Sequence, residues 1–181
     1  MKKLLLLITF ISLPSYSAVS ANVSFTSDYI WRGMTQSDGP AIQGGFDYAN
    51  DSGFYAGIWG SNVNFNDGAG SELDYYFGYG FEMGGIGVDL GYVAFDYPEN
   101  TTGLDFEEIV LGLSMGDLGL TFALGQDGAP DYTEVSYGIG AVGIAYGQYD
   151  DYGDNLSISY GFTCGSYDCG LAYSDFSDDG Y

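Results

Sequence analysis

The strongest constraint in this sequence is an alternation of large apolar residues with small or polar ones at a period of two. In residues 72–83 one set of alternate positions holds Leu73, Tyr75, Phe77, Tyr79, Phe81 and Met83, and the other holds Glu72, Asp74, Tyr76, Gly78, Gly80 and Glu82. Successive side chains of a β-strand point to opposite faces, whereas a helical pattern would repeat every ~3.6 residues. The segment is therefore predicted to be a strand with one apolar face.

The same alternation recurs along the chain and predicts an all-β fold of eleven antiparallel strands. The clearest segments are 23–32, 72–83, 86–92, 118–124 and 156–162, and less regular ones are 41–49, 54–65, 104–115, 133–139, 142–149 and 169–174. We treat these segments as one domain that begins at Asn22 and runs to Tyr181.

The residues on the two faces favour a membrane protein. The polar positions are mostly Gly, Ser, Ala, Thr and Asn with occasional acids, whereas the outer face of a soluble sandwich would carry many long charged side chains. Small residues suit the crowded interior of a barrel, and apolar and aromatic residues suit a surface in lipid. We predict a transmembrane β-barrel, with a soluble secreted β-sandwich as the alternative.

The predicted connections alternate in length, as in outer-membrane barrels, which have short periplasmic turns and longer external loops. The longer ones are 33–40, 66–71, 98–103, 125–132 and 150–155, and the shorter ones are 50–53, 84–85, 116–117, 140–141 and 165–168. An antiparallel barrel needs an even number of strands to close, and unpaired edges are costly in lipid. We therefore expect about twelve strands in the complete protein, with the last one missing from this sequence or the barrel closed in another way.

The N-terminus has the features of a secretory signal peptide, residues 1–21. Lys2 and Lys3 precede an apolar run at 4–13, and Val19-Ser20-Ala21 ends in a small-residue cleavage pattern. This run is too short to span a bilayer as a helix, which takes ~20 residues. We expect export, cleavage before Asn22, and location in an outer membrane.

Charge and composition exclude several function classes. The sequence has 25 Asp and Glu, 3 Lys and Arg, and no His, which argues against nucleic-acid binding because phosphate recognition needs clustered cations. Without His, hydrolytic triads and the common zinc sites are also excluded. We expect no enzymatic activity, no cofactor and no metal site. Acidic loops near 150–154 and 175–179 are predicted to be solvated, with Ca²⁺ binding as the alternative.

Seven charged residues are candidates to line the lumen and set its selectivity. They are Asp28, Arg32, Asp47, Asp74, Glu82, Asp89 and Glu134. Arg32 is the only Lys or Arg after the signal peptide, and a buried guanidinium needs an acidic partner, for which Asp28, Asp47 and Asp74 are candidates. The pair would either pin the chain or take part in gating or solute binding. The excess of acids predicts a preference for cations.

Cys164 and Cys169 share the outward face of a predicted hairpin. In an oxidising compartment this arrangement favours a disulfide over free thiols.

Aromatic residues near the predicted strand ends fit the interfacial girdles of barrels, with carbohydrate stacking as the alternative. They are Tyr29, Trp31, Tyr55, Trp59, Tyr97, Tyr146 and Tyr149.

Three sequence blocks resemble the start of the TorF-type porins, which are outer-membrane proteins of Gram-negative bacteria. They are SDYIWRGMTQSD at 27–38, QGGFDY at 43–48 and SGFYAGIWGSNV at 52–63, and weaker matches are ELDYY at 72–76 and GLAYSD at 170–175. Family members usually continue past the equivalent of Asp178-Asp179-Gly180 into a final strand that ends in an aromatic residue.

The resemblance implies a porin-like channel for passive diffusion of small solutes or ions. Such a protein would contact outer-membrane lipid and the barrel-assembly machinery. The alternative is a non-conducting barrel, filled by its own Tyr side chains, with a structural or surface-interaction role.

Overall fold

The computed structural model describes residues 18–66, 68–98 and 103–178, and this part of the chain is all-β. The main sheet contains eleven strands: β1 (Ala18–Thr26), β4 (Ala41–Ala49), β5 (Phe54–Asn62), β6 (Ser71–Met83), β7 (Ile86–Asp96), β8 (Phe106–Met115), β9 (Leu118–Gly125), β10 (Tyr132–Ile139), β11 (Val142–Tyr149), β12 (Gly153–Cys164) and β13 (Tyr167–Asp178). A two-stranded hairpin, β2 (Ile30–Trp31) and β3 (Met34–Thr35), lies between β1 and β4 in the sequence. The prediction of eleven antiparallel strands is confirmed.

Four predicted segments fall partly outside the described residues. They are the signal peptide, at residues 1–17, the loop 66–71, at residue 67, the loop 98–103, at residues 99–102, and the acidic loop 175–179, at residue 179; residues 180 and 181 are not described either. The expected cleavage point before Asn22 falls within β1. In the described ranges, no helix is long and apolar enough to cross a membrane.

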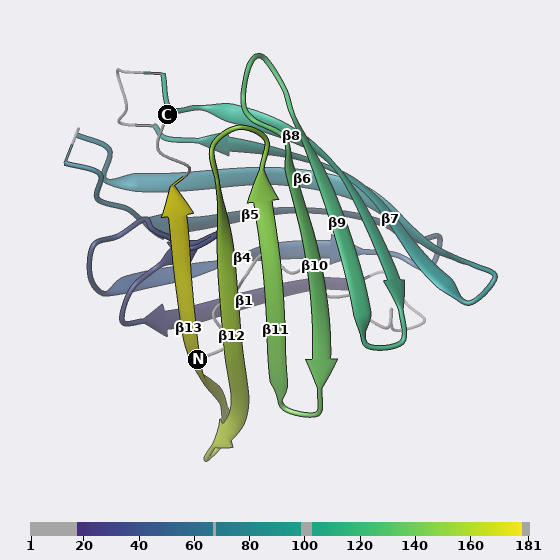
Figure 1. The fold of residues 1–181 in the computed structure, drawn as a ribbon. Coiled ribbons are helices and arrows are strands. Elements are labelled where there is room, and N and C mark those ends of the chain that lie inside the picture. The colour runs from purple at the N-terminus through teal and green to yellow at the C-terminus, as the bar shows by residue number, and fades with distance from the viewer. Residues whose placement is uncertain (1–17, 67, 99–102, 179–181) are drawn as a thin grey trace.

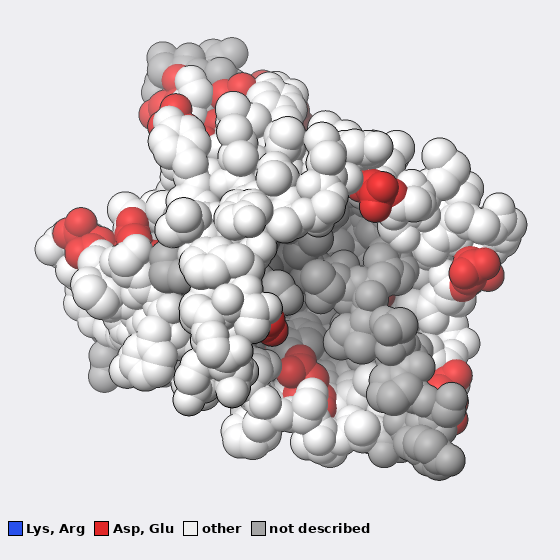
Figure 2. All heavy atoms as spheres, turned by 90° about the horizontal axis from the view of Figure 1, so that it is seen from below, with Lys and Arg blue, Asp and Glu red and all other residues white. Residues whose placement is uncertain are grey.

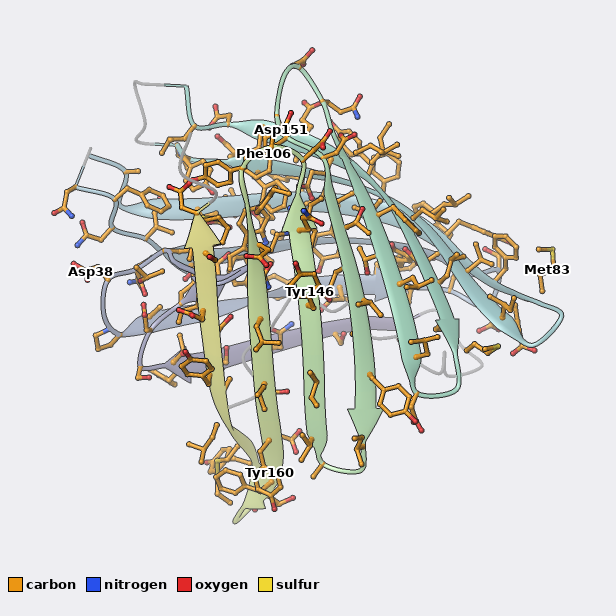
Figure 3. All side chains as sticks on the ribbon, in the orientation of Figure 1. Asp38, Met83, Phe106, Tyr146, Asp151 and Tyr160 are labelled. Atoms are coloured by element: carbon orange, nitrogen blue, oxygen red, sulfur yellow. A yellow bond between two sulfur atoms is a disulfide. The ribbon has the colours of Figure 1, made fainter. Side chains whose placement is uncertain are left out.

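Each strand of the main sheet pairs antiparallel with its neighbour in the sequence, so the fold is a simple meander (Figure 1). One end of the sheet carries the turns 84–85, 116–117, 140–141 and 165–166 and the four-residue connection 50–53. The other end carries 27–40, 63–70, 97–105, 126–131 and 150–152. Figure 3 illustrates the two ends, with Asp38 and Asp151 in the longer loops and Met83 beside a two-residue turn. The alternation in connection length therefore holds, although 150–152 is shorter than expected because β12 begins at Gly153.

The sheet is strongly curled but open (Figure 1). Its edges are β1 and β13, which do not pair with each other in the described residues. Each antiparallel pairing reverses the strand direction. A sheet of eleven strands contains an even number of such pairings, so β1 and β13 run in the same direction. The structure thus establishes an open eleven-stranded sheet, and not the closed barrel expected from the sequence.

The two faces of the curled sheet have opposite character. The outer face exposes large apolar side chains on every strand, among them Phe25 at 71%, Phe77 at 52% and Leu171 at 65% exposure. The inner face buries polar side chains, and the largest fully buried ones are Glu108 and Asp74. Large apolar residues outside and acids inside are the reverse of the arrangement in a water-soluble fold, although the interior also buries an apolar cluster that includes Trp59, Val93 and Phe95.

Candidate functional site

The connection between β1 and β4 enters the interior of the curled sheet, and we call residues 27–40 the inner loop. The predicted first strand ends at Thr26 and not at Arg32, because the chain then forms the hairpin of β2 and β3. Arg32 and Gly33 form its two-residue turn with positive φ angles of 45° and 86°, the backbone geometry that fits tight hairpins. The backbone N–H of Gln36 donates to the carbonyl of Tyr29 at 2.7 Å, and the turn places Arg32 at the tip.

Arg32 is held by a buried carboxylate across the interior. Its Nη1 and Nη2 donate to the two oxygens of Glu108 at 2.6 and 2.8 Å, and Nη1 also donates to the Tyr149 hydroxyl at 3.3 Å. The guanidinium lies 3.9 Å from the ring centre of Tyr132 and 4.2 Å from that of Trp31. Burial alone would lower the pKa of Arg32, but the hydrogen bonds and charge of Glu108 outweigh it and raise the pKa, so Arg32 is a fixed cation.

Aromatic packing fixes the rest of the inner loop. The Trp31 ring contacts Phe95, Phe106 and Tyr149, with centroids 5.6, 5.8 and 6.3 Å away. On the other side of the hairpin, a Cβ added at Gly33 would lie 2.8 Å from the carbonyl oxygen of Asp175 in β13. The inner loop therefore contacts strands from both halves of the sheet.

A second buried cluster joins the inner loop to β5 and β6. The Tyr29 hydroxyl donates to Glu72 at 2.9 Å, and the Tyr29 ring lies 5.4 Å from that of Trp59. Trp59 stands opposite Asp74 in the β5–β6 register. Among the described residues, Trp59 Nε1, Glu72 Oε2 and Asp74 Oδ1 are buried without a hydrogen-bond partner.

The acids of this cluster act on two tyrosines outside the strands, Tyr29 and Tyr97. Burial, followed by the negative charges of Glu72 and Asp74, raises the pKa of both hydroxyls. The two tyrosines are therefore neutral hydrogen-bond donors at any ordinary pH.

The other predicted lumen residues occupy separate positions. Asp47 and Asp89 lie on the inner face, where they accept hydrogen bonds from the hydroxyls of Tyr76 and Tyr55. Asp28 stays in the inner loop and accepts from Thr35 at 2.7 Å, and Glu82 is exposed near the end of β6. None of Asp28, Asp47 and Asp74, the three partners expected for Arg32, forms its ion pair, because the hairpin carries Arg32 across to Glu108 on β8.

Glu134 lines a cavity beneath the inner loop. Its Oε2 accepts a hydrogen bond from the Tyr132 hydroxyl at 2.9 Å, and the residue is 8% exposed. The cavity has a volume of about 310 Å³ and extends from Arg32 to the turn Gly116-Asp117. Figure 2, seen from below, shows a hollow on this side of the molecule, with acidic side chains in its depth and no Lys or Arg among the visible atoms of the described residues.

The family described as "Bacterial protein of unknown function (Gcw_chp)" matches residues 13–146. The chain belongs to this family. No curated protein and no solved structure matches it.

In this Gcw_chp protein most of the predicted girdle aromatics face inward. Tyr29, Trp59, Tyr97 and Tyr149 are 3–7% exposed, Trp31 packs against them, and Tyr55 bonds to Asp89 inside. Only Tyr146 of the seven is an exposed outer residue, at 43% (Figure 3). The girdle prediction is wrong for the other six. Four of them, Tyr29, Trp31, Tyr97 and Tyr149, lie outside the strands of the main sheet or at a strand end. The other two, Tyr55 and Trp59, have inward parity.

The predicted disulfide between Cys164 and Cys169 is present, with the two Cα atoms 5.9 Å apart. The turn between the strands is shorter than expected, at 165–166, so the cysteines are diagonal rather than directly opposite neighbours. In the described ranges, no group of three or more His, Cys, Asp or Glu residues is placed to hold a metal ion.

Sequence reasoning missed Glu108 and Glu72 as site residues. Glu108 lies at alternate positions with the small residues Gly112 and Ser114, on one face of segment 104–115. The alternation of that segment therefore already predicted that Glu108 points inward. Glu72 was on the polar parity of its strand. Neither pattern identifies the inner-loop residue that each acid contacts, Arg32 for Glu108 and Tyr29 for Glu72, because these contacts depend on how the inner loop folds.

Proposed function

We propose that this protein is an outer-membrane β-barrel that forms a porin-like channel for small solutes or ions, narrowed at its outer end by the inner loop. The observation that carries the proposal is the inside-out distribution of side chains. A belt of exposed apolar residues on every strand, far larger than the patches tolerated on soluble proteins, fits a lipid environment. The buried acids of the inner face fit a lumen.

The proposed barrel closes with one further strand, antiparallel to both β1 and β13. This is the geometry that two edges running in the same direction require, and it gives the twelve strands expected from the sequence. The signal peptide predicted at 1–21 and the resemblance to TorF-type porins support export to the outer membrane of a Gram-negative bacterium. Lipid and the barrel-assembly machinery are the proposed partners.

The proposed selectivity follows from the charges on the inner face. Arg32, the only Lys or Arg in the described ranges, is neutralised by Glu108. Asp47, Asp89 and Glu134 have tyrosine hydroxyls as hydrogen-bond partners, and the ion pair of Arg32 is with none of them. Uncompensated carboxylates raise the local cation concentration and repel anions. We therefore propose a transport role with preference for cations.

The packing of the inner loop favours a second candidate, a non-conducting barrel with a structural or surface role. The loop contacts β5, β6, β7, β8, β10 and β11 through side chains. In this candidate the same contacts close the lumen permanently.

The test is the current through planar bilayers containing the refolded full-length protein under a KCl gradient. Faster gel migration before boiling than after it, typical of intact barrels, confirms folding first. The channel proposal expects discrete conductance steps and a reversal potential of the sign for cation preference, weaker at high salt where the screening length falls to ~3 Å near 1 M. Anion preference would contradict the lumen assignment, and folded protein without conductance would establish the second candidate.

A further inference from the structure

The cavity beneath the inner loop has the size and position of a solute-binding site. Its volume of about 310 Å³ equals about ten water molecules at ~30 Å³ each, near the lower limit of ligand pockets at roughly 300 Å³. It is bounded at the inner loop by Trp31 and Arg32 and at the other end by the turn Gly116-Asp117. A solute that enters from the short-turn end therefore meets the inner loop before it can pass.

The charge on the cavity wall is negative. Glu108, Glu134 and Asp117 line it together with one cation, Arg32. The charge of Arg32 is matched by both oxygens of Glu108 at 2.6 and 2.8 Å. Glu134 receives a single neutral hydroxyl, that of Tyr132. The charge of Arg32 acts on Glu134, but the ion pair of Arg32 is with Glu108. Within the described ranges no second Lys or Arg exists, so two nearly buried carboxylates share one cation.

The rest of the wall is a mixture of apolar and hydroxyl groups. Trp31, Phe95, Val93 and Val110 form an apolar part next to the inner loop. Thr121 on β9 and Ser136 on β10 add hydroxyl groups to the cavity wall. A carboxylate beside aromatic rings recognises an organic cation, because the carboxylate binds the charge and the ring faces attract both the charge and the carbon body.

We propose that this cavity binds small organic ammonium ions, with the ammonium at Glu134 and the carbon body against Trp31 and Phe95. The inference deepens the proposed channel function by naming a solute class. Inorganic cations gain nothing from the apolar part of the wall, whereas the carbon chain of a small alkylammonium packs against it. Anions are disfavoured by Glu134, and neutral alcohols lack the charge that it binds.

Trp31 gives a direct readout of occupancy. Trp59 lies in the separate Glu72 cluster and its indole N–H has no partner, so Trp59→Phe removes its emission and leaves a smaller aromatic ring in its place. In this background, folded in detergent micelles, n-butylammonium is titrated against Trp31 fluorescence, with 1-butanol and butyrate as probes of matched size. The proposal expects a saturable change with n-butylammonium, and at least tenfold weaker responses to the other two. The unmodified protein receives the same titration.

Glu134→Gln tests the anchor, and Glu82→Gln is its matched control because Glu82 is exposed and absent from the cavity wall. Glu134→Gln keeps an oxygen that accepts from Tyr132 and is expected to weaken n-butylammonium binding about tenfold, because it removes the charge with which the ammonium pairs. Glu82→Gln should leave it unchanged. Folding of each variant is checked by gel migration before and after boiling.

The inference is overturned if 1-butanol binds as well as n-butylammonium, or if folded Glu134→Gln binds n-butylammonium as tightly as the unmodified protein. The comparison of the three probes needs no Glu134 variant, so it decides the matter even if that variant does not fold. Conductance in KCl without an n-butylammonium response would refute this inference and leave the channel intact. An n-butylammonium response without conductance would refute the channel and leave the site.

Discussion

At the scale of residues, the Arg32–Glu108 ion pair is the electrostatic interaction on which stability is expected to depend most. The side chains are 12% and 2% exposed. A pair at this depth is costly to break, because the remaining charge stays out of water without a partner.

Arg32→Met is therefore expected to lower the free energy of unfolding by about 3–5 kcal/mol, because it strands Glu108. Arg32→Met with Glu108→Gln should recover part of the loss. Glu107→Gln, on the opposite face of β8, is the control and should change stability by under ~0.5 kcal/mol. Urea titrations in detergent micelles measure all three, and equal losses in the single and double variants would contradict the pairing.

Asp74 offers a prediction of the opposite sign. Its Oδ1 and the neighbouring Glu72 Oε2 are buried acceptors without donors. Two buried carboxyls this close share a proton instead of both ionising. Asp74→Asn supplies a permanent N–H₂ donor to Glu72, so we expect a gain of about 1–3 kcal/mol at alkaline pH, where the native pair would lose that proton. The gain should shrink in acid, where the carboxyls take up protons. Asp47→Asn, at an acid with two donors of its own, should not stabilise the protein, and a loss of stability for Asp74→Asn would refute the reasoning.

At the scale of elements, the β2–β3 hairpin depends on Gly33. A Cβ there would lie 2.8–2.9 Å from atoms of Asp175, Asn155 and Phe176, and the residue has φ of +86°. Gly85 has nearly the same φ, +82°, but no atom within 4 Å of such a Cβ.

Gly33→Ala is expected to displace the hairpin and destabilise the protein more than Gly85→Ala, because only the former adds a clash to the unfavourable φ. Near-ultraviolet circular dichroism, which follows the packing of Trp31, should change for Gly33→Ala alone. Equal effects of the two variants would show that the close contact with β13 is unimportant.

The strands were predictable from sequence because one pattern, period two, decides both their existence and their orientation. Segments 41–49 and 142–149 match β4 and β11 at both ends. The β2–β3 hairpin was not predictable, because Tyr29, Trp31 and Arg32 continue the alternation of β1 in the sequence. Their inward position depends on tertiary contacts that the sequence pattern does not show. The same cause misplaced Tyr29 and Trp31 as girdle residues and left Glu108 unrecognised.

At the scale of the whole molecule, the proposed topology places the longer connections outside the cell. Short peptide tags inserted at Asp127 and at Asp151, both at the end of the sheet that carries the inner loop, should be labelled by antibody on intact cells. A tag at Gly84, in a short turn, should be labelled only after permeabilisation. Labelling at Gly84 on intact cells would reverse the topology.

The central claim is that the apolar outer face contacts lipid while the inner face does not. Both tryptophans, Trp31 and Trp59, lie on the inside, whereas Phe77 is an outer residue at 52% exposure. The most direct measurement is the quenching of tryptophan fluorescence by bilayers with brominated acyl chains, comparing the unmodified protein with Phe77→Trp in a Trp31→Phe, Trp59→Phe background. The account predicts strong quenching of the tryptophan introduced at position 77 and weak quenching of Trp31 and Trp59. Strong quenching of the native tryptophans with none at position 77 would contradict it.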